Sequence, residues 1–279
     1  MNYPNNGWVT ALLRSVCLVV ATFCIPVYAA NFSSNAGTGS GPVHFKAEQI
    51  IGFAKQVERA LAAKGARVAI IGRIGRPPSE MPEGMGFTHA AFAVFSDITT
   101  SDGRRLSGYA MFNEYQNNDH PDTSALVQDY PVDFFAGVAE LKAGVIIPSA
   151  ELQRRLLEVI ASPTYKALHE PHYSAIANPY TLGRQNCTEF VLDVVNAAIY
   201  QTDDIRVIKA NENAFFVAQP VNVNPLKLML GSMFSSEVSL SDQPGPPVTA
   251  TFERIADYIK KYDEGSQVFE IVPLANDKR

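Results

Sequence analysis

The number and positions of the cysteines most constrain what this chain can fold into. The chain has 279 residues and three cysteines, two of which lie in an apolar run over residues 16–29. The run follows a polar start, ends in small residues and is shorter than a membrane span, which is typical of a secretory signal peptide over residues 1–29, cut near Ala29. We therefore expect a periplasmic or secreted protein that keeps only Cys187 and folds without an internal disulfide.

Composition excludes several classes of protein. The chain is 47% apolar and 18% charged, which is ordinary for a globular protein. Its formal net charge of −5 gives no attraction to nucleic acid. After signal removal no stretch is long and apolar enough to cross a bilayer, so we expect no transmembrane segment. Residues 30–45 are small and polar, which predicts a flexible lead-in, and residues 46–279 are expected to form a single domain.

The first half of the mature chain alternates between helical and strand patterns. Apolar residues recur at three- and four-residue steps from Ala47, and Gly65 ends that helix. Asp102-Gly103 is a strong hairpin signal between two of the strands. Strands are predicted over three segments: 67–73, 88–95 and 106–115.

The second half adds helices and two further strands. Ser149 is the expected N-cap of one helix, and Cys187 begins another. Residues 206–250 are expected to form short strands and loops. The remaining elements are predicted as a strand at 143–149, helices at 150–161, 187–200 and 251–262, and a strand at 267–272. This order predicts the α+β class, an antiparallel sheet packed against helices.

Cys187 is the first candidate for chemistry because it stands where a helix begins. The positive end of the helix dipole and the unpaired backbone N–H groups there stabilise a thiolate, so we expect a lowered thiol pKa. The same N–H groups can bind the oxyanion of an acyl transfer. The alternative is an inert cysteine that serves as a small apolar core residue.

A nucleophilic cysteine needs a base, and His89 is the first choice. His89 begins a predicted strand, and its same-face neighbours Ala91 and Ala93 are small. That face therefore has room for a helix start to pack against it and meet the imidazole.

His169 and His172 are the reserve candidates for the base. They lie in the segment HEPHY, close to Cys187 in sequence. Pro171 between them is incompatible with a helical pair of zinc ligands, so we expect no metal and no cofactor.

Two short motifs resemble a known group of enzymes. NCTEFV (186–191) resembles the helix start of the lecithin:retinol acyltransferase-like proteins, in the circularly permuted NlpC-type branch of the papain-like superfamily. THAAFAV (88–94) resembles the strand that carries the catalytic histidine in that branch, and histidine precedes cysteine here as it does there. The resemblance implies a papain-like antiparallel sheet packed against helices, with the cysteine at a helix N-terminus.

A wider likeness covers residues 87–262. It links the chain to a family of exported bacterial proteins known only as a domain of unknown function, which implies no activity. Four segments carry it: FNEY (112–115), IPSAELQRRLLEVIASP (147–163), LHEPHYS (168–174) and NPLKLMLGSMF (224–234).

The residue that orients the histidine is expected on the neighbouring strand. A two-residue turn at Asp102-Gly103 puts Glu114 and Gln116 on the face of His89, whereas a one-residue bulge presents Asn113. An asparagine or a carboxylate can each orient an imidazole through a hydrogen bond, and the family likeness centres on Asn113. The predicted site is therefore Cys187, His89 and Asn113. Glu114 is the alternative to Asn113. Gln185 is either an oxyanion donor or a loop-capping amide.

The sequence thus predicts an exported thiol hydrolase or acyl/peptidyl transferase. Its substrate would be an amide or ester of a peptide, acyl group or lipid, attacked by Cys187. The alternative is a catalytically silent periplasmic binding or envelope-associated protein on the same fold.

Overall fold

The structure is a computed structural model. The predicted signal peptide, most of the lead-in and the segment 224–234 lie outside the residues that it describes. Within the described residues, no helix has both the length and the apolar character needed to span a bilayer. The described residues are 44–77, 81, 83–100, 102–222 and 238–274.

A six-stranded antiparallel sheet runs through the molecule in the order β4-β3-β2-β1-β5-β8. Its central strands are rich in β-branched and aromatic residues, which pack well on a pleated surface. This arrangement confirms the predicted α+β class. The strands are β1 (Val68–Ile74), β2 (His89–Thr99), β3 (Arg105–Gln116), β4 (Ser124–Asp129), β5 (Glu140–Ile147) and β8 (Gln267–Ile271), with a separate pair β6 (Gln219–Pro220) and β7 (Val248–Thr249).

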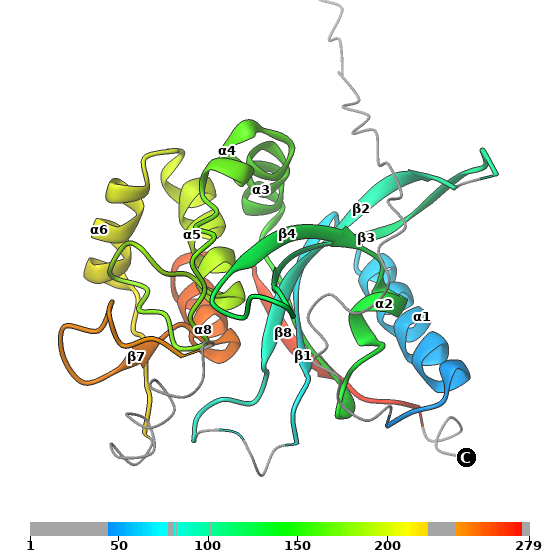
Figure 1. Cartoon of the computed structure of the whole chain (residues 1–279). Coiled ribbons are helices and arrows are strands. Elements are labelled where there is room, and N and C mark those ends of the chain that lie inside the picture. The colour runs from blue at the N-terminus through cyan, green and yellow to red at the C-terminus, as the bar shows by residue number, and fades with distance from the viewer. Residues whose placement is uncertain (1–43, 78–80, 82, 101, 223–237, 275–279) are drawn as a thin grey trace, which may run out of the picture.

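Helices cover both faces of the sheet (Figure 1). One face packs against α1 (Ala47–Ala63) and α2 (Pro131–Phe135). The other face packs against five helices: α3 (Ala150–Ala161), α4 (Pro163–Ala167), α5 (Cys187–Tyr200), α6 (Ile205–Phe215) and α8 (Phe252–Tyr262). The faces are called below the α1 face and the α5 face.

Strand β2 sends alternate side chains to these two faces. Ala90, Phe92 and Val94 join the core under α5, while Ala91 and Ala93 join the core under α1. We expected the α5 start to pack on the Ala91/Ala93 face, and this was wrong. The room that the two alanines leave is filled by α1 and α2 instead.

The β2–β3 hairpin decides which side chain accompanies His89. Thr99 pairs with Arg105, and Thr100 and Arg104 are hydrogen-bonded across the turn, where Gly103 has φ +81°. This turn is one residue longer than the two-residue turn considered from the sequence. The register therefore puts Asn113 on the α1 face and Glu114 on the α5 face.

Helix α6 replaces part of the short strands and loops expected over 206–250. Asp204 caps it by accepting a hydrogen bond from the backbone N–H of Arg206. Its buried residues include Lys209 and Glu212, so the inner face of this helix is charged and its periodicity was not visible as an apolar stripe.

We predict that Gly144→Ala lowers the free energy of unfolding by about 1–3 kcal/mol, because the core is overpacked. An added Cβ would lie 2.5 Å from the Phe252 ring and 2.8 Å from the Phe87 ring. Urea unfolding of the protein measures the change. Gly245→Ala is the matched control, since its Cβ meets nothing within 4 Å. Equal stability of the two variants would contradict the prediction.

Candidate functional site

Asn186 fixes the start of α5. Its side-chain Oδ1 accepts hydrogen bonds from the backbone N–H groups of Thr188 (3.2 Å) and Glu189 (3.0 Å), as an asparagine N-cap does. Cys187 is thereby held as the first residue of the helix. The cap already occupies two of the N–H groups that the sequence offered as oxyanion donors.

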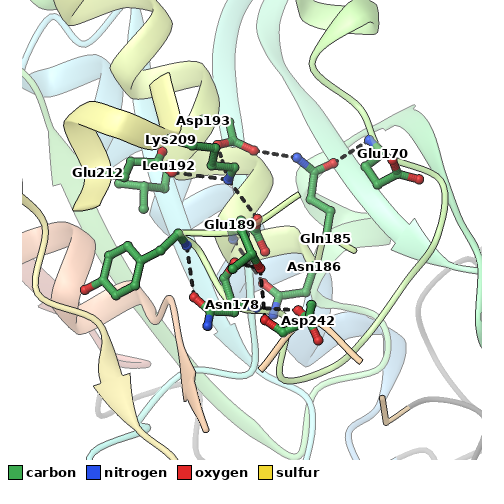
Figure 2. Close-up of polar contacts among 12 residues, drawn as sticks. Glu170, Asn178, Gln185, Asn186, Glu189, Leu192, Asp193, Lys209, Glu212 and Asp242 are labelled. Atoms are coloured by element: carbon green, nitrogen blue, oxygen red, sulfur yellow. Dashed lines mark hydrogen bonds and ion pairs between the residues drawn. The ribbon is translucent and has the colours of Figure 1, made fainter. Parts of the chain in front are cut away.

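A buried ion network lies behind this helix start (Figure 2). The Lys209 ammonium contacts Glu189 at 2.8 Å, Asp193 at 2.6 Å and Glu212 at 3.2 Å. Burial opposes the lysine charge, but the three carboxylates overcome it and raise the pKa of Lys209. Such a network ties α6 to α5, and removing the lysine would leave buried carboxylates without compensation.

Gln185 belongs to the same hydrogen-bonded network. Its Oε1 accepts from the Glu170 N–H at 2.8 Å (Figure 2). Its Nε2 donates to the Leu168 carbonyl at 3.1 Å and to Asp193 at 2.6 Å. The amide is fully used, so of its two sequence interpretations the structure favours the loop-capping amide.

His89 and Asn113 are brought together. The His89 Nε2 lies 3.2 Å from Asn113 Oδ1, and its ring stacks on Tyr115 with centroids 4.8 Å apart and planes at 14°. The ring also packs on Phe134 of α2 at 5.6 Å, so it lies on the α1 face. Burial lowers the pKa of His89 well below its usual value, and the Arg73 guanidinium lowers it further. The imidazole is therefore neutral at pH 7.

Cys187 is nearly sealed from solvent, with 5% of its surface exposed. Burial raises the pKa of its thiol to about 12, although hydrogen bonds from the backbone N–H groups of Ala90 and Thr188 act in the opposite direction. The expectation of a lowered thiol pKa was wrong, because desolvation outweighs the helix start.

The sulfur lies beside the peptide that carries the imidazole. The N–H of Ala90, the residue directly after His89, lies near enough to the sulfur to lower the pKa of the thiol. Among the described residues, no hydrogen bond joins the sulfur to the His89 ring itself. Cys187 approaches from the α5 face while the ring packs on the α1 face, so the resting structure holds two neutral groups on either side of one backbone segment.

Glu114 points to the α5 face, away from His89. It is 1% exposed, and neither carboxyl oxygen has a well-aligned hydrogen-bond donor. Burial raises the pKa of Glu114 to about 8, and the nearby Ser124 hydroxyl lowers it only in part. This carboxyl does not contact His89, whereas Asn113 does.

The reserve histidines have other partners. His169 Nε2 lies 2.9 Å from the Ser124 hydroxyl, and His172 Nδ1 lies 2.5 Å from Glu170. Within the described part of the chain, no three His, Cys, Asp or Glu side chains are placed to hold a metal ion.

Comparison with protein families gives one match. A family model described as an uncharacterized protein conserved in bacteria (DUF2145) covers residues 60–259. The chain belongs to this family. The matched part of this DUF2145 chain includes Cys187, His89 and Asn113. No curated protein and no solved structure matches it. The family description carries no activity.

Sequence reasoning missed Tyr115 and Asp129 as members of the His89 cluster. Tyr115 stacks on the imidazole and donates its hydroxyl to Asp129 at 2.9 Å, and Asn113 donates to the same carboxylate at 2.8 Å. Asp129 ends β4, a strand that was not predicted because its polar residues gave no clear alternation. The one signal in the sequence was the aromatic residue Tyr115, which stands two positions after Asn113 and therefore on the same face of the strand.

We predict that Glu114→Gln removes a loss of folding stability that the wild type undergoes as the pH rises. The Glu114 pKa is raised from 4.5 to about 8 on folding, so folded chains bind the extra proton and stability falls as pH rises from 4.5 to 8. Relative to wild type, the variant should gain up to about 5 kcal/mol between pH 4.5 and 9. Urea unfolding across that range measures the gain. A constant difference between the two proteins would contradict the assignment.

Proposed function

We propose that this chain is an exported thiol hydrolase or acyl/peptidyl transferase. Cys187 is the nucleophile, His89 is the base, and Asn113 orients the base. The observation that carries the proposal is the His89 Nε2 to Asn113 Oδ1 contact of 3.2 Å, in a chain whose lone mature thiol lies at the next peptide. This contact occupies one ring nitrogen and leaves Nδ1 for the proton of the sulfur.

The charges of the resting site decide how the nucleophile is activated. Because burial raises the pKa of the thiol to about 12 and lowers the pKa of the imidazole, a standing thiolate–imidazolium pair is disfavoured. The proton therefore moves to His89 as the sulfur attacks, in general-base catalysis. Attack also requires a rearrangement that brings the sulfur and the ring to one side of β2, because they lie on opposite sides of the backbone at Ala90.

The reaction balances without a cofactor. The sulfur forms a bond to the carbonyl carbon of an amide or ester, the bond to the leaving nitrogen or oxygen breaks, and His89 passes the thiol proton to that leaving group. The product is a thioester on Cys187. Water completes hydrolysis, and a second nucleophile completes a transfer.

The papain-like assignment and the export of the protein belong to this proposal. An antiparallel sheet packed against a helix that begins at Cys187, with His89 and Asn113 on neighbouring strands, supports the papain-like fold. The sequence pattern of residues 1–29 supports export, and residues 46–279 are taken as one domain. A peptide, an acyl group or a lipid would be the substrate.

One observation favours a second function. The buried, protonated thiol on the face opposite the imidazole is also what an inactive member of the fold would show. In that case the protein binds a peptide, glycan or envelope partner without turning it over.

Acylation by p-nitrophenyl hexanoate distinguishes the enzyme from the binding protein. We predict one hexanoyl group per mature chain, located on Cys187 by intact-mass and peptide mass spectrometry. His89→Gln should slow its formation by about 10²–10⁴-fold, because the proton loses its acceptor.

His120→Gln is the matched control, since His120 is exposed in a loop. It should acylate at the wild-type rate. Failure of folded wild type to acylate at Cys187, or equal rates for wild type and His89→Gln, would favour the binding protein.

A further inference from the structure

Four side chains on the α1 face form a continuous hydrogen-bonded chain. The Tyr115 hydroxyl donates to Asp129 Oδ2 at 2.9 Å, and Asn113 Nδ2 donates to Asp129 Oδ1 at 2.8 Å. Asn113 Oδ1 then faces His89 Nε2 at 3.2 Å. Tyr115 and Asn113 are only 2% and 1% exposed, so water does not compete for these contacts.

The carboxylate of Asp129 determines which way the Asn113 amide faces. An ionised carboxylate can only accept hydrogen bonds, so a neighbouring amide must turn its NH₂ group towards it. The amide oxygen of Asn113 is then forced to the opposite side, towards His89. The reverse orientation would set two acceptors against each other at Asp129 and would leave a buried group unsatisfied.

The orientation of Asn113 in turn determines the tautomer of His89. A carbonyl oxygen facing Nε2 requires a proton on Nε2. A neutral imidazole carries one N–H, so Nδ1 has a free lone pair. Nδ1 has no hydrogen-bond partner in the described part of the chain, which leaves it open to accept a proton.

We propose that Asp129 is a positioning residue that, acting through Asn113, holds His89 as the Nε2–H tautomer. The tautomer itself does not depend on the proposed function. Only its consequence rests on that function, namely that the unprotonated Nδ1 accepts the proton of Cys187. Tyr115 supports it twice, by donating to Asp129 and by stacking on the imidazole.

The charged surroundings of Asp129 set the conditions for a test. Burial raises the pKa of Asp129 to about 7, Arg73 on β1 opposes the rise, and Asp133 on α2 adds to it. Tyr115 and Asn113 on β3 stabilise the ionised form by donating hydrogen bonds. Measurements at about pH 8.5 therefore examine an ionised Asp129 beside a neutral His89.

Nitrogen NMR of the mature chain labelled with ¹⁵N-histidine reads the tautomer directly, because protonated and bare ring nitrogens differ in chemical shift. We expect wild type to show His89 as Nε2–H alone. In Asp129→Asn the new amide can offer either its oxygen or its NH₂ to Asn113. The ratio of Nδ1–H to Nε2–H should then rise at least about tenfold, as expected from losing a hydrogen bond to a charged group.

Asp133→Asn is the matched control. It removes a nearby negative charge that has no place in the hydrogen-bonded chain, and should leave the tautomer unchanged. A wild-type His89 protonated on Nδ1, which needs no variant to detect, would overturn the proposal. So would an Asp129→Asn protein, folded by near-ultraviolet circular dichroism, with the wild-type tautomer ratio.

The outcome is separable from that of the proposed function. The tautomer is measured whether or not Cys187 forms a thioester, and Cys187→Ser should not alter it. If His89 is the Nε2–H tautomer but Cys187 never acylates, the proposed enzymatic function is contradicted and the positioning role of Asp129 is supported. Acylation with the opposite tautomer would do the reverse.

Discussion

The alternation of side chains along β2 and β3 is the constraint on which the site depends. Because successive residues point to opposite faces, His89 and Asn113 share the α1 face while Glu114 points to α5. Cys187 reaches the sheet from the α5 side and meets the backbone N–H of Ala90. A shift of one residue in the β2–β3 register would exchange Asn113 for Glu114 and disconnect His89 from its partner.

Burial then determines the chemistry that this arrangement can perform. It disfavours every charged form, so the thiol stays protonated and the imidazole stays neutral. The helix start that was expected to generate a thiolate is occupied by the Asn186 cap and supported from behind by the Lys209 network. In the proposed reaction the proton therefore moves during attack, and the orientation of His89 matters more than the charge of Cys187.

Local patterns predicted the elements better than they predicted the contacts. The helices starting at Ala47, Ala150, Cys187 and Phe252 follow from apolar periodicity and from caps such as Ser149. Helix α6 was missed because Lys209 and Glu212 occupy its inner face, where ion pairing replaces apolar packing. The pairing of His89 with Asn113 was predicted. The turn length left Glu114 equally open, and only the register of the folded hairpin separates them. The sequence left Cys187 open between a reactive thiol and an inert core residue. The face of the sheet on which α5 packs is not encoded in a local pattern.

The central claim is that a neutral Cys187 thiol loses its proton to His89 in the act of attack. The most direct measurement is the rate of Cys187 acylation by p-nitrophenyl hexanoate in H₂O and in D₂O, for wild type and for His89→Gln. General-base transfer predicts a slower wild-type reaction in D₂O, with the difference lost in His89→Gln. Equal wild-type rates in the two solvents would contradict the account, because they would show that no proton moves in the step that forms the thioester.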